Sequence, residues 1–136
     1  MIYLDSSALL KLIRREDETA ALSAWLSERP EQPVVSSELG RVEVLKAARR
    51  IGDRALTEAH AVVGDIDLVP LDRTVQDLAS EIGYPLLRAL DALHLASAVL
   101  LSNELTAFIA YDQRLTSAAK AVGLVVATPG RDPGTA

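Results

Sequence analysis

Five short apolar segments alternate with helix-forming segments along this chain of 136 residues, and this alternation limits the folds that it can adopt. The apolar segments cover residues 2–4, 34–35, 66–71, 107–111 and 124–127. Strands that alternate with helices form a parallel sheet with helices packed on both of its faces. The sequence therefore predicts an α/β domain over residues 1–129, with a five-stranded parallel sheet flanked by helices on both faces. A C-terminal tail is expected over residues 130–136.

The expected helices lie between and after these strands, at residues 8–14, 17–28, 38–51, 55–63, 74–82, 88–103 and 114–122. A serine hydroxyl at the start of a helix accepts a hydrogen bond from a free backbone N–H group. We therefore expect Ser6 or Ser7 to cap the first helix and Ser36 or Ser37 to cap the third.

The composition excludes some kinds of site and indicates a compartment. The chain has no cysteine, which excludes disulfides and thiolate metal sites and fits a reducing cytoplasm. No secretory leader is visible, and the longest apolar stretch, at residues 89–101, is shorter than the roughly 20 residues that span a membrane. We therefore expect a soluble cytoplasmic protein with no membrane partner.

Four acidic residues that lie far apart in the sequence are expected at one edge of the sheet. Asp5 follows the first strand and Asp112 follows the fourth. The helix that leads into the fourth strand begins at the same edge, and Asp91 lies in its first turn. Glu43 lies in the first half of the helix after the second strand. In open parallel sheets, ligands bind at the carboxyl ends of the strands, so these acids mark a candidate site.

Each acid also has a purely structural explanation. Asp5 and Asp112 could cap helices, Asp91 could favour a helix dipole, and Glu43 could pair with a neighbouring base on its own helix. Four carboxylates at one edge would repel one another, and the usual outcome is a raised pKa or a bound cation. An all-oxygen set of ligands suits Mg²⁺ or Mn²⁺.

Two further residues lie beside these acids in the sequence. His94 follows Asp91 by one helical turn, so it could orient that carboxylate or be a buried histidine with satisfied hydrogen bonds. Ser7 could donate a hydrogen bond to Asp5 or to a metal-bound water, or it could only cap its helix.

Four segments together resemble the PIN domain, and more narrowly the VapC-type toxins of bacterial toxin–antitoxin pairs. They read MIYLDSSALLKL, SSELGRVEVLKAARR, LRALDALHLASAVLL and FIAYDQRLTSAAKAVGLVV, and the likeness extends from residue 1 to residue 129. The acidic positions of that family fall on Asp5, Glu43, Asp91 and Asp112. Ser7 falls on the hydroxyl that accompanies the first acid, and Thr116 is the nearest candidate for a further polar position.

The resemblance implies a PIN-like fold and a metal-dependent endoribonuclease. Asp5, Glu43, Asp91 and Asp112 would hold one or two Mg²⁺ or Mn²⁺ ions, and a metal-activated water would cleave RNA to leave 5′-phosphate and 3′-hydroxyl ends. The resemblance further implies a homodimer, a VapB-type antitoxin whose tail occupies the cleft, and a structured RNA target such as tRNA or rRNA.

The net charge of −5 does not favour a polyanionic partner, so RNA would have to meet local basic groups. The predicted RNA contacts are Lys11, Arg14, Arg15, Arg49 and Arg50. With one Phe, three Tyr and one Trp, extensive stacking of bases on aromatic rings is not expected.

Two other functions are weighed. A phosphatase with Asp5 as nucleophile would want a second Asp two residues later, where Ser7 stands. A non-catalytic PIN-like module that only binds an antitoxin or RNA is the main alternative.

Overall fold

The computed structural model describes residues 1–131 and folds them around a five-stranded parallel sheet, as predicted. The strands are β1 (Ile2–Leu4), β2 (Val34–Ser37), β3 (Asp67–Val69), β4 (Ala107–Ile109) and β5 (Val126–Ala127). Their order across the sheet is β3-β2-β1-β4-β5, so β1 is the central strand. In the parallel pairing of β1 with β4, Leu4 lies opposite Ile109, so the chain leaves both strands at the same edge.

Seven helices connect or follow these strands in the described part of the chain. They are α1 (Ser6–Lys11), α2 (Thr19–Ser27), α3 (Glu38–Ile51), α4 (Asp53–Gly64), α5 (Arg73–Ala79), α6 (Ala89–Val99) and α7 (Gln113–Ala121). The prediction that α6 extends to residue 103 is wrong, because the chain turns tightly after Val99. The prediction that a serine caps α1 is also wrong, because the carboxylate of Asp5 accepts the capping hydrogen bond. Ser37 caps α3, as expected.

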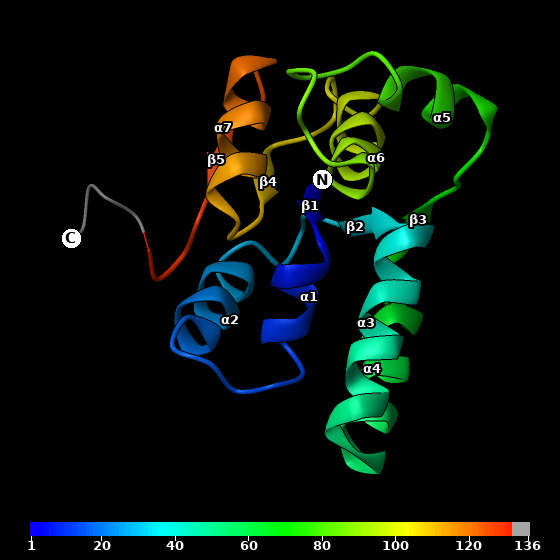
Figure 1. The fold of residues 1–136 in the computed structure, drawn as a ribbon. Helices are drawn as coiled ribbons and strands as arrows, with labels where there is room; N and C mark the ends of the chain where they lie inside the picture. The colour runs from blue at the N-terminus through cyan, green and yellow to red at the C-terminus, as the bar shows by residue number, and fades with distance from the viewer. Residues whose placement is uncertain (132–136) are drawn as a thin grey trace.

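Alternate side chains of the central strand point into two separate cores. Ile2 and Leu4 lie in one core and Tyr3 lies in the other, and all three are fully buried. The first core also contains Leu9, Leu22 and Val44, and the second contains Leu95, Phe108 and Leu115. Helices therefore cover both faces of the sheet, with α1 and α2 on the opposite side from α6 and α7 (Figure 1).

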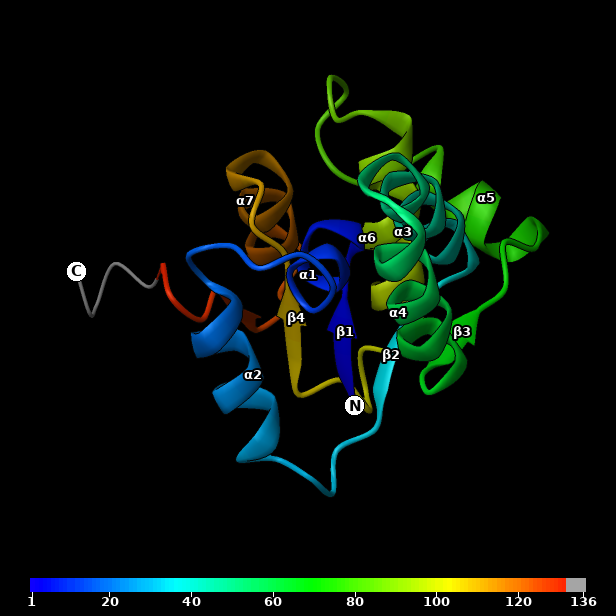
Figure 2. The same cartoon turned by 90° about the horizontal axis from the view of Figure 1, so that it is seen from below.

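The strands deliver several helices to one edge of the sheet. In Figure 2, β1 and β4 run side by side, and α1 and α7 lie near the same ends of these two strands. The helix α3 follows directly after β2, which pairs with the other side of β1. This connectivity brings the first turns of α1, α3 and α7 close to the carboxyl edge.

The predicted tail begins with two residues that contact the body of the domain. The backbone of Gly130 approaches Glu18 closely, and the Arg131 guanidinium pairs with the Glu18 carboxylate. Residues 132–136 of the predicted tail lie outside the described residues. Among residues 1–131, no helix has the length and apolar character that a membrane crossing requires.

Candidate active site

Asp5 is the buried acid at the centre of the candidate site. It directly follows β1 and is 4% exposed. One carboxylate oxygen, Oδ1, accepts hydrogen bonds from the Ser7 hydroxyl at 2.7 Å and from the Ala8 N–H group at 3.0 Å. Burial raises the pKa of the Asp5 carboxyl, because desolvation disfavours its charged form. No Lys or Arg in the described residues pairs with this carboxylate.

Asp112 lies three residues after the end of β4, the strand that pairs with β1. It caps α7, and its Oδ1 accepts hydrogen bonds from the N–H groups of Arg114 and Leu115 at 2.8 and 3.2 Å. The capping function considered from the sequence is therefore present for both Asp5 and Asp112. In each carboxylate the hydrogen bonds go to Oδ1, and Oδ2 has no hydrogen-bond partner among the described residues.

Asp91 lies in the first turn of α6 and is half-buried. Burial raises the pKa of Asp91, and the charge of Asp112 raises it further. Neither oxygen of Asp91 accepts a hydrogen bond within residues 1–131, and its carboxylate is the least restrained of the four. Glu43 on α3 also raises the pKa of both Asp5 and Asp91 by charge repulsion.

These repulsions link the four predicted acids in pairs. Repulsion acts between Asp112 and Asp91, between Asp91 and Glu43, and between Glu43 and Asp5. Across residues 1–131, no three acidic or histidine side chains are already gathered closely enough to hold a metal ion. The set of donors nevertheless suits a hard divalent cation, because every one of the four has a carboxylate oxygen that no residue of the range 1–131 engages.

His94 is the partner that holds Glu43. Its Nε2 lies 2.7 Å from Glu43 Oε1, and its Nδ1 lies 2.7 Å from the hydroxyl of Tyr3. A carboxylate only accepts hydrogen bonds, so His94 Nε2 carries a proton, and in the tautomer that leaves Nδ1 as an acceptor the Tyr3 hydroxyl donates to it. Burial raises the pKa of Tyr3, which keeps this hydroxyl a donor. Tyr3, His94 and Glu43 therefore form one chain of hydrogen bonds that reaches from the sheet to the site.

The hydrogen bonds of His94 bear on two predictions from the sequence. His94 contacts Glu43 from another helix, so the expectation that it orients Asp91 is wrong, and its hydrogen bonds are satisfied as the other reading predicted. Glu43 does not pair with a base on its own helix. The contact depends on a close approach of α3 to His94, because a Cβ at Gly40 would lie only 3.3 Å from the His94 ring.

The two hydroxyl candidates differ in what they contact. Ser7 donates to Asp5 and also accepts a hydrogen bond from the backbone N–H of Tyr111, at 3.2 Å. It therefore ties Asp5 to the end of β4. Thr116 is buried on α7, and its hydroxyl donates to the backbone oxygen of Gln113 at 3.1 Å, within its own helix.

A family model described as the PIN domain matches residues 2–121. The chain belongs to the PIN domain family. Ribonuclease VapC47 of Mycobacterium tuberculosis is 45% identical to it over 133 residues, which are 96% of this chain and 98% of the relative. The predicted membership of the VapC type is therefore confirmed.

Solved structures of PIN-like proteins confirm the fold. The M. tuberculosis VapC20 structure, described as a sarcin–ricin loop cleaving toxin, matches with a TM-score of 0.70 at 20% identity, covering 95% of this chain and all of that one. VapBC2 from Rickettsia felis, bound to a DNA fragment from its promoter, matches with a TM-score of 0.64 at 10% identity, covering 95% and 98%.

One predicted RNA contact of this PIN domain does not fit the structure. Lys11 is 5% exposed, and its ammonium group pairs with Glu18 Oε1 at 2.9 Å. It also lies 4.7 Å from the centre of the Tyr111 ring. A buried and paired lysine is not available to a phosphate on the surface. The prediction that Lys11 contacts RNA is therefore wrong.

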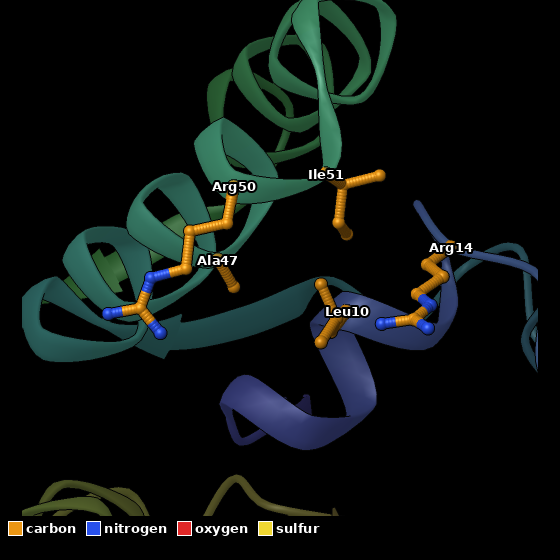
Figure 3. Close-up of a pocket in the computed structure, with 5 residues that line it drawn as sticks. All are labelled: Leu10, Arg14, Ala47, Arg50 and Ile51. Carbon is orange, nitrogen blue, oxygen red and sulfur yellow. The ribbon is translucent and has the colours of Figure 1, made fainter.

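The other predicted RNA contacts are exposed. Arg14 and Arg50 line a groove between α1 and α3, and Figure 3 shows them on either side of Leu10, Ala47 and Ile51. An adjoining hollow shares Leu10 and Ala47 with this groove. Its further lining includes Ser7 and Glu43, so the groove leads to the acidic site. Arg15 and Arg49 are exposed but do not line the groove.

Proposed function

We propose that this PIN domain is a Mg²⁺- or Mn²⁺-dependent endoribonuclease and the toxin of a VapBC-type pair. The single observation that carries this proposal is the electrostatic repulsion that links Asp112 to Asp91, Asp91 to Glu43 and Glu43 to Asp5, all four with a carboxylate oxygen that no described residue engages. The printed name of the 45% identical relative, a ribonuclease, supports the same activity.

The four acids would hold the divalent cation. Such a cation, when bound, supplies Lewis-acid chemistry: it withdraws charge from the phosphate and lowers the pKa of water. Hydrogen bonds hold three of these carboxylates in one orientation. Ser7 holds Asp5, backbone N–H groups hold Asp112, and His94 holds Glu43. Asp91 is free to adjust, which allows the cluster to close around an ion.

The proposed reaction is hydrolysis of a phosphodiester in RNA. The oxygen of a water molecule bonds to phosphorus and the bond from phosphorus to the 3′ oxygen breaks. The proton lost by the water is taken up by solvent, and the 3′ oxygen leaves as a hydroxyl after it gains a proton. The products carry 5′-phosphate and 3′-hydroxyl ends, because water and not the ribose 2′-hydroxyl attacks.

The groove between α1 and α3 would guide part of the RNA to the acids. Arg14 and Arg50 lie on opposite sides of that groove and can contact phosphates, while its apolar lining offers no base-specific hydrogen bonds. Such contacts position the RNA but do not read its sequence. Selection of a structured target such as tRNA or rRNA would then depend on shape.

The proposed partners follow from the VapC type. The R. felis neighbour is a VapBC complex, which supports a VapB-type antitoxin as partner of this chain. A homodimer and a cytoplasmic location are proposed on the family resemblance. A non-catalytic module that only binds an antitoxin or RNA is the competing function, and it is less favoured because all four acids are retained.

The test compares cleavage by the full chain with and without divalent metal. We expect total cellular RNA to be cut at defined positions in Mg²⁺ or Mn²⁺, no cutting in EDTA, and 5′-phosphate ends on mapped products. Asp5→Asn should abolish cleavage while Asp65→Asn, at an exposed acid that caps the end of α4, should not. Cleavage by Asp5→Asn at the wild-type rate, or products with 2′,3′-cyclic phosphates, would reject the proposed mechanism.

A further inference from the structure

A second polar pocket, separate from the α1–α3 groove, is lined by residues that neighbour Asp112 in the sequence. It lies between α7 and the segment that follows β5, and Figure 1 shows this segment leaving β5 beside α7. Its lining includes Tyr111 and Gln113, the two residues that flank Asp112 in the sequence. The pocket has a volume of about 300 Å³. Anything bound there would therefore lie next to one of the four acids.

One wall of the pocket is a face of α7. Gln113, Ser117 and Lys120 line it, and their spacing of four and three residues places them on one side of the helix. All three side chains are exposed, and Lys120 makes no ion pair within residues 1–131. The α7 wall therefore offers an amide, a hydroxyl and an unpaired ammonium group to a ligand.

The facing wall carries a second cation, Arg131. Its Nε pairs with the Glu18 carboxylate, its Nη1 donates to the Tyr111 carbonyl oxygen at 3.3 Å, and its guanidinium lies 5.6 Å from the centre of the Tyr111 ring. These contacts fix the direction of the guanidinium, although half of the side chain remains exposed. Rigid cations lose little conformational entropy when they bind an anion.

The charged residues that line this pocket are both basic, Lys120 and the Arg131 that pairs with Glu18. No acidic residue of the described part lines it, whereas the whole chain has 19 acidic and 14 basic residues. A pocket with two cations and neutral hydrogen-bonding groups suits a phosphate with a ribose attached. It offers no open aromatic face for base stacking, because Tyr111 is buried against Lys11 and Arg131.

We propose that this pocket binds the phosphate and ribose of the RNA nucleotide next to the scissile bond. Lys120 pairs with the phosphate, and Gln113 and Ser117 accept and donate hydrogen bonds to the ribose hydroxyls. This inference rests on the proposed function, because the acids beside the pocket are the groups that would cleave the chain. The RNA would then contact the protein both in the α1–α3 groove and in this pocket, with the acids between the two contacts.

The experiment measures RNA binding in a background that does not cleave. A fluorescently labelled stem–loop RNA is titrated with Asp5→Asn protein, with and without Lys120→Gln, at several salt concentrations. Loss of one phosphate contact should lower the slope of log K against log salt by about 0.7–1 and weaken binding roughly uniformly across RNA sequences. A second variant, Ser117→Tyr, fills the pocket without changing charge and should also weaken binding. Thermal melts establish that the variants are folded.

The control is Lys46→Gln, which removes the same charge from an exposed lysine on α3, outside the pocket. An equal loss of slope for Lys46→Gln and Lys120→Gln would assign the effect to net charge and overturn the proposal, as would unchanged binding by Lys120→Gln and Ser117→Tyr. Binding is measured without cleavage. A protein that binds RNA through Lys120 but never cuts it would therefore contradict the proposed function and leave the pocket in place.

Discussion

Tyr3→Phe tests whether the hydrogen-bond chain from Tyr3 through His94 organises Glu43. The substitution removes one oxygen atom from a residue that is fully buried. The ring keeps its stacking on Phe108, whose centre lies 5.3 Å away, so packing should change little. The only contact that must be lost is the 2.7 Å hydrogen bond to His94 Nδ1.

The expected loss of stability follows from leaving that nitrogen without its donor. A buried acceptor without a partner costs about 1–3 kcal/mol. The hydroxyls of Ser36, Ser37 and Ser97 lie near the Tyr3 hydroxyl and can replace part of the contact with His94, so a loss of about 1–2 kcal/mol is expected. For a chain of this length that lowers the melting temperature by roughly 3–8 °C.

The same substitution should weaken metal binding. Without the Tyr3 hydroxyl, the ring of His94 is no longer restricted to the tautomer that donates to Glu43. Groups that orient a ligand typically contribute roughly 10–100-fold to metal affinity. We expect the affinity for Mn²⁺, measured by titration calorimetry, to fall about tenfold. The control is Tyr84→Phe, at a tyrosine that is 41% exposed and should change neither quantity.

Two results would refute this reasoning. A urea midpoint equal to that of the wild type would mean that the hydrogen bond does not hold His94 in place. A lower midpoint with unchanged Mn²⁺ affinity would mean that Glu43 finds its direction without His94.

Three further predictions concern the residues around this centre. The pKa of Asp5 is raised in the folded state, so ionisation of Asp5 lowers the stability of the fold as the pH rises above the ordinary carboxyl pKa of about 4. Metal-free Asp5→Asn should therefore unfold at a higher urea concentration than the wild type at pH 7. This difference should shrink as the pH falls toward 4. Gly40→Ala should lose about 1–2 kcal/mol in urea unfolding and weaken Mn²⁺ binding, because its Cβ would stand 2.5 Å from the Ser36 hydroxyl. Glu18→Gln should lose about 3 kcal/mol at neutral pH, because it removes the closer partner of the buried Lys11 ammonium, at 2.9 Å, and leaves it only Glu16 at 3.6 Å. The pKa of Glu18 is lowered in the folded state, so the gap between wild type and Glu18→Gln should close as the pH falls through the carboxyl range; a constant gap would contradict the ion pair.

The location of the acids could be predicted from the sequence because it depends on connectivity. Residues that follow parallel strands must emerge at the same edge, so Asp5 and Asp112 were placed without knowledge of any side-chain contact. Glu43 and Asp91 follow from the direction of the helices beside those strands. The order of strands in the sheet was not needed for this conclusion.

Contacts between helices could not be predicted in the same way. His94 is one turn from Asp91 in the sequence, but its partner is Glu43 on another helix, and that pairing depends on the close approach that Gly40 permits. Lys11 was predicted to contact RNA, which requires an exposed side chain. The helix instead ends at Lys11, and the chain turns back so that Glu18 covers the ammonium group.

Two buried carboxylates of this chain differ in their partners and in the direction of their pKa shifts, and this difference bears on function. Glu18 is 5% exposed and is paired with Lys11 and Arg131, which lower its pKa. Asp5 is 4% exposed and has no basic side chain as a partner in the described part of the chain, and its pKa is raised. Lys11 and Arg131 therefore neutralise Glu18, the buried acid that ties the C-terminal segment to the domain. At Asp5 it provides hydrogen bonds to one oxygen only. Such an uncompensated cost is typical of sites where the charge is used, and it supports the proposal that Asp5 helps to bind a divalent cation.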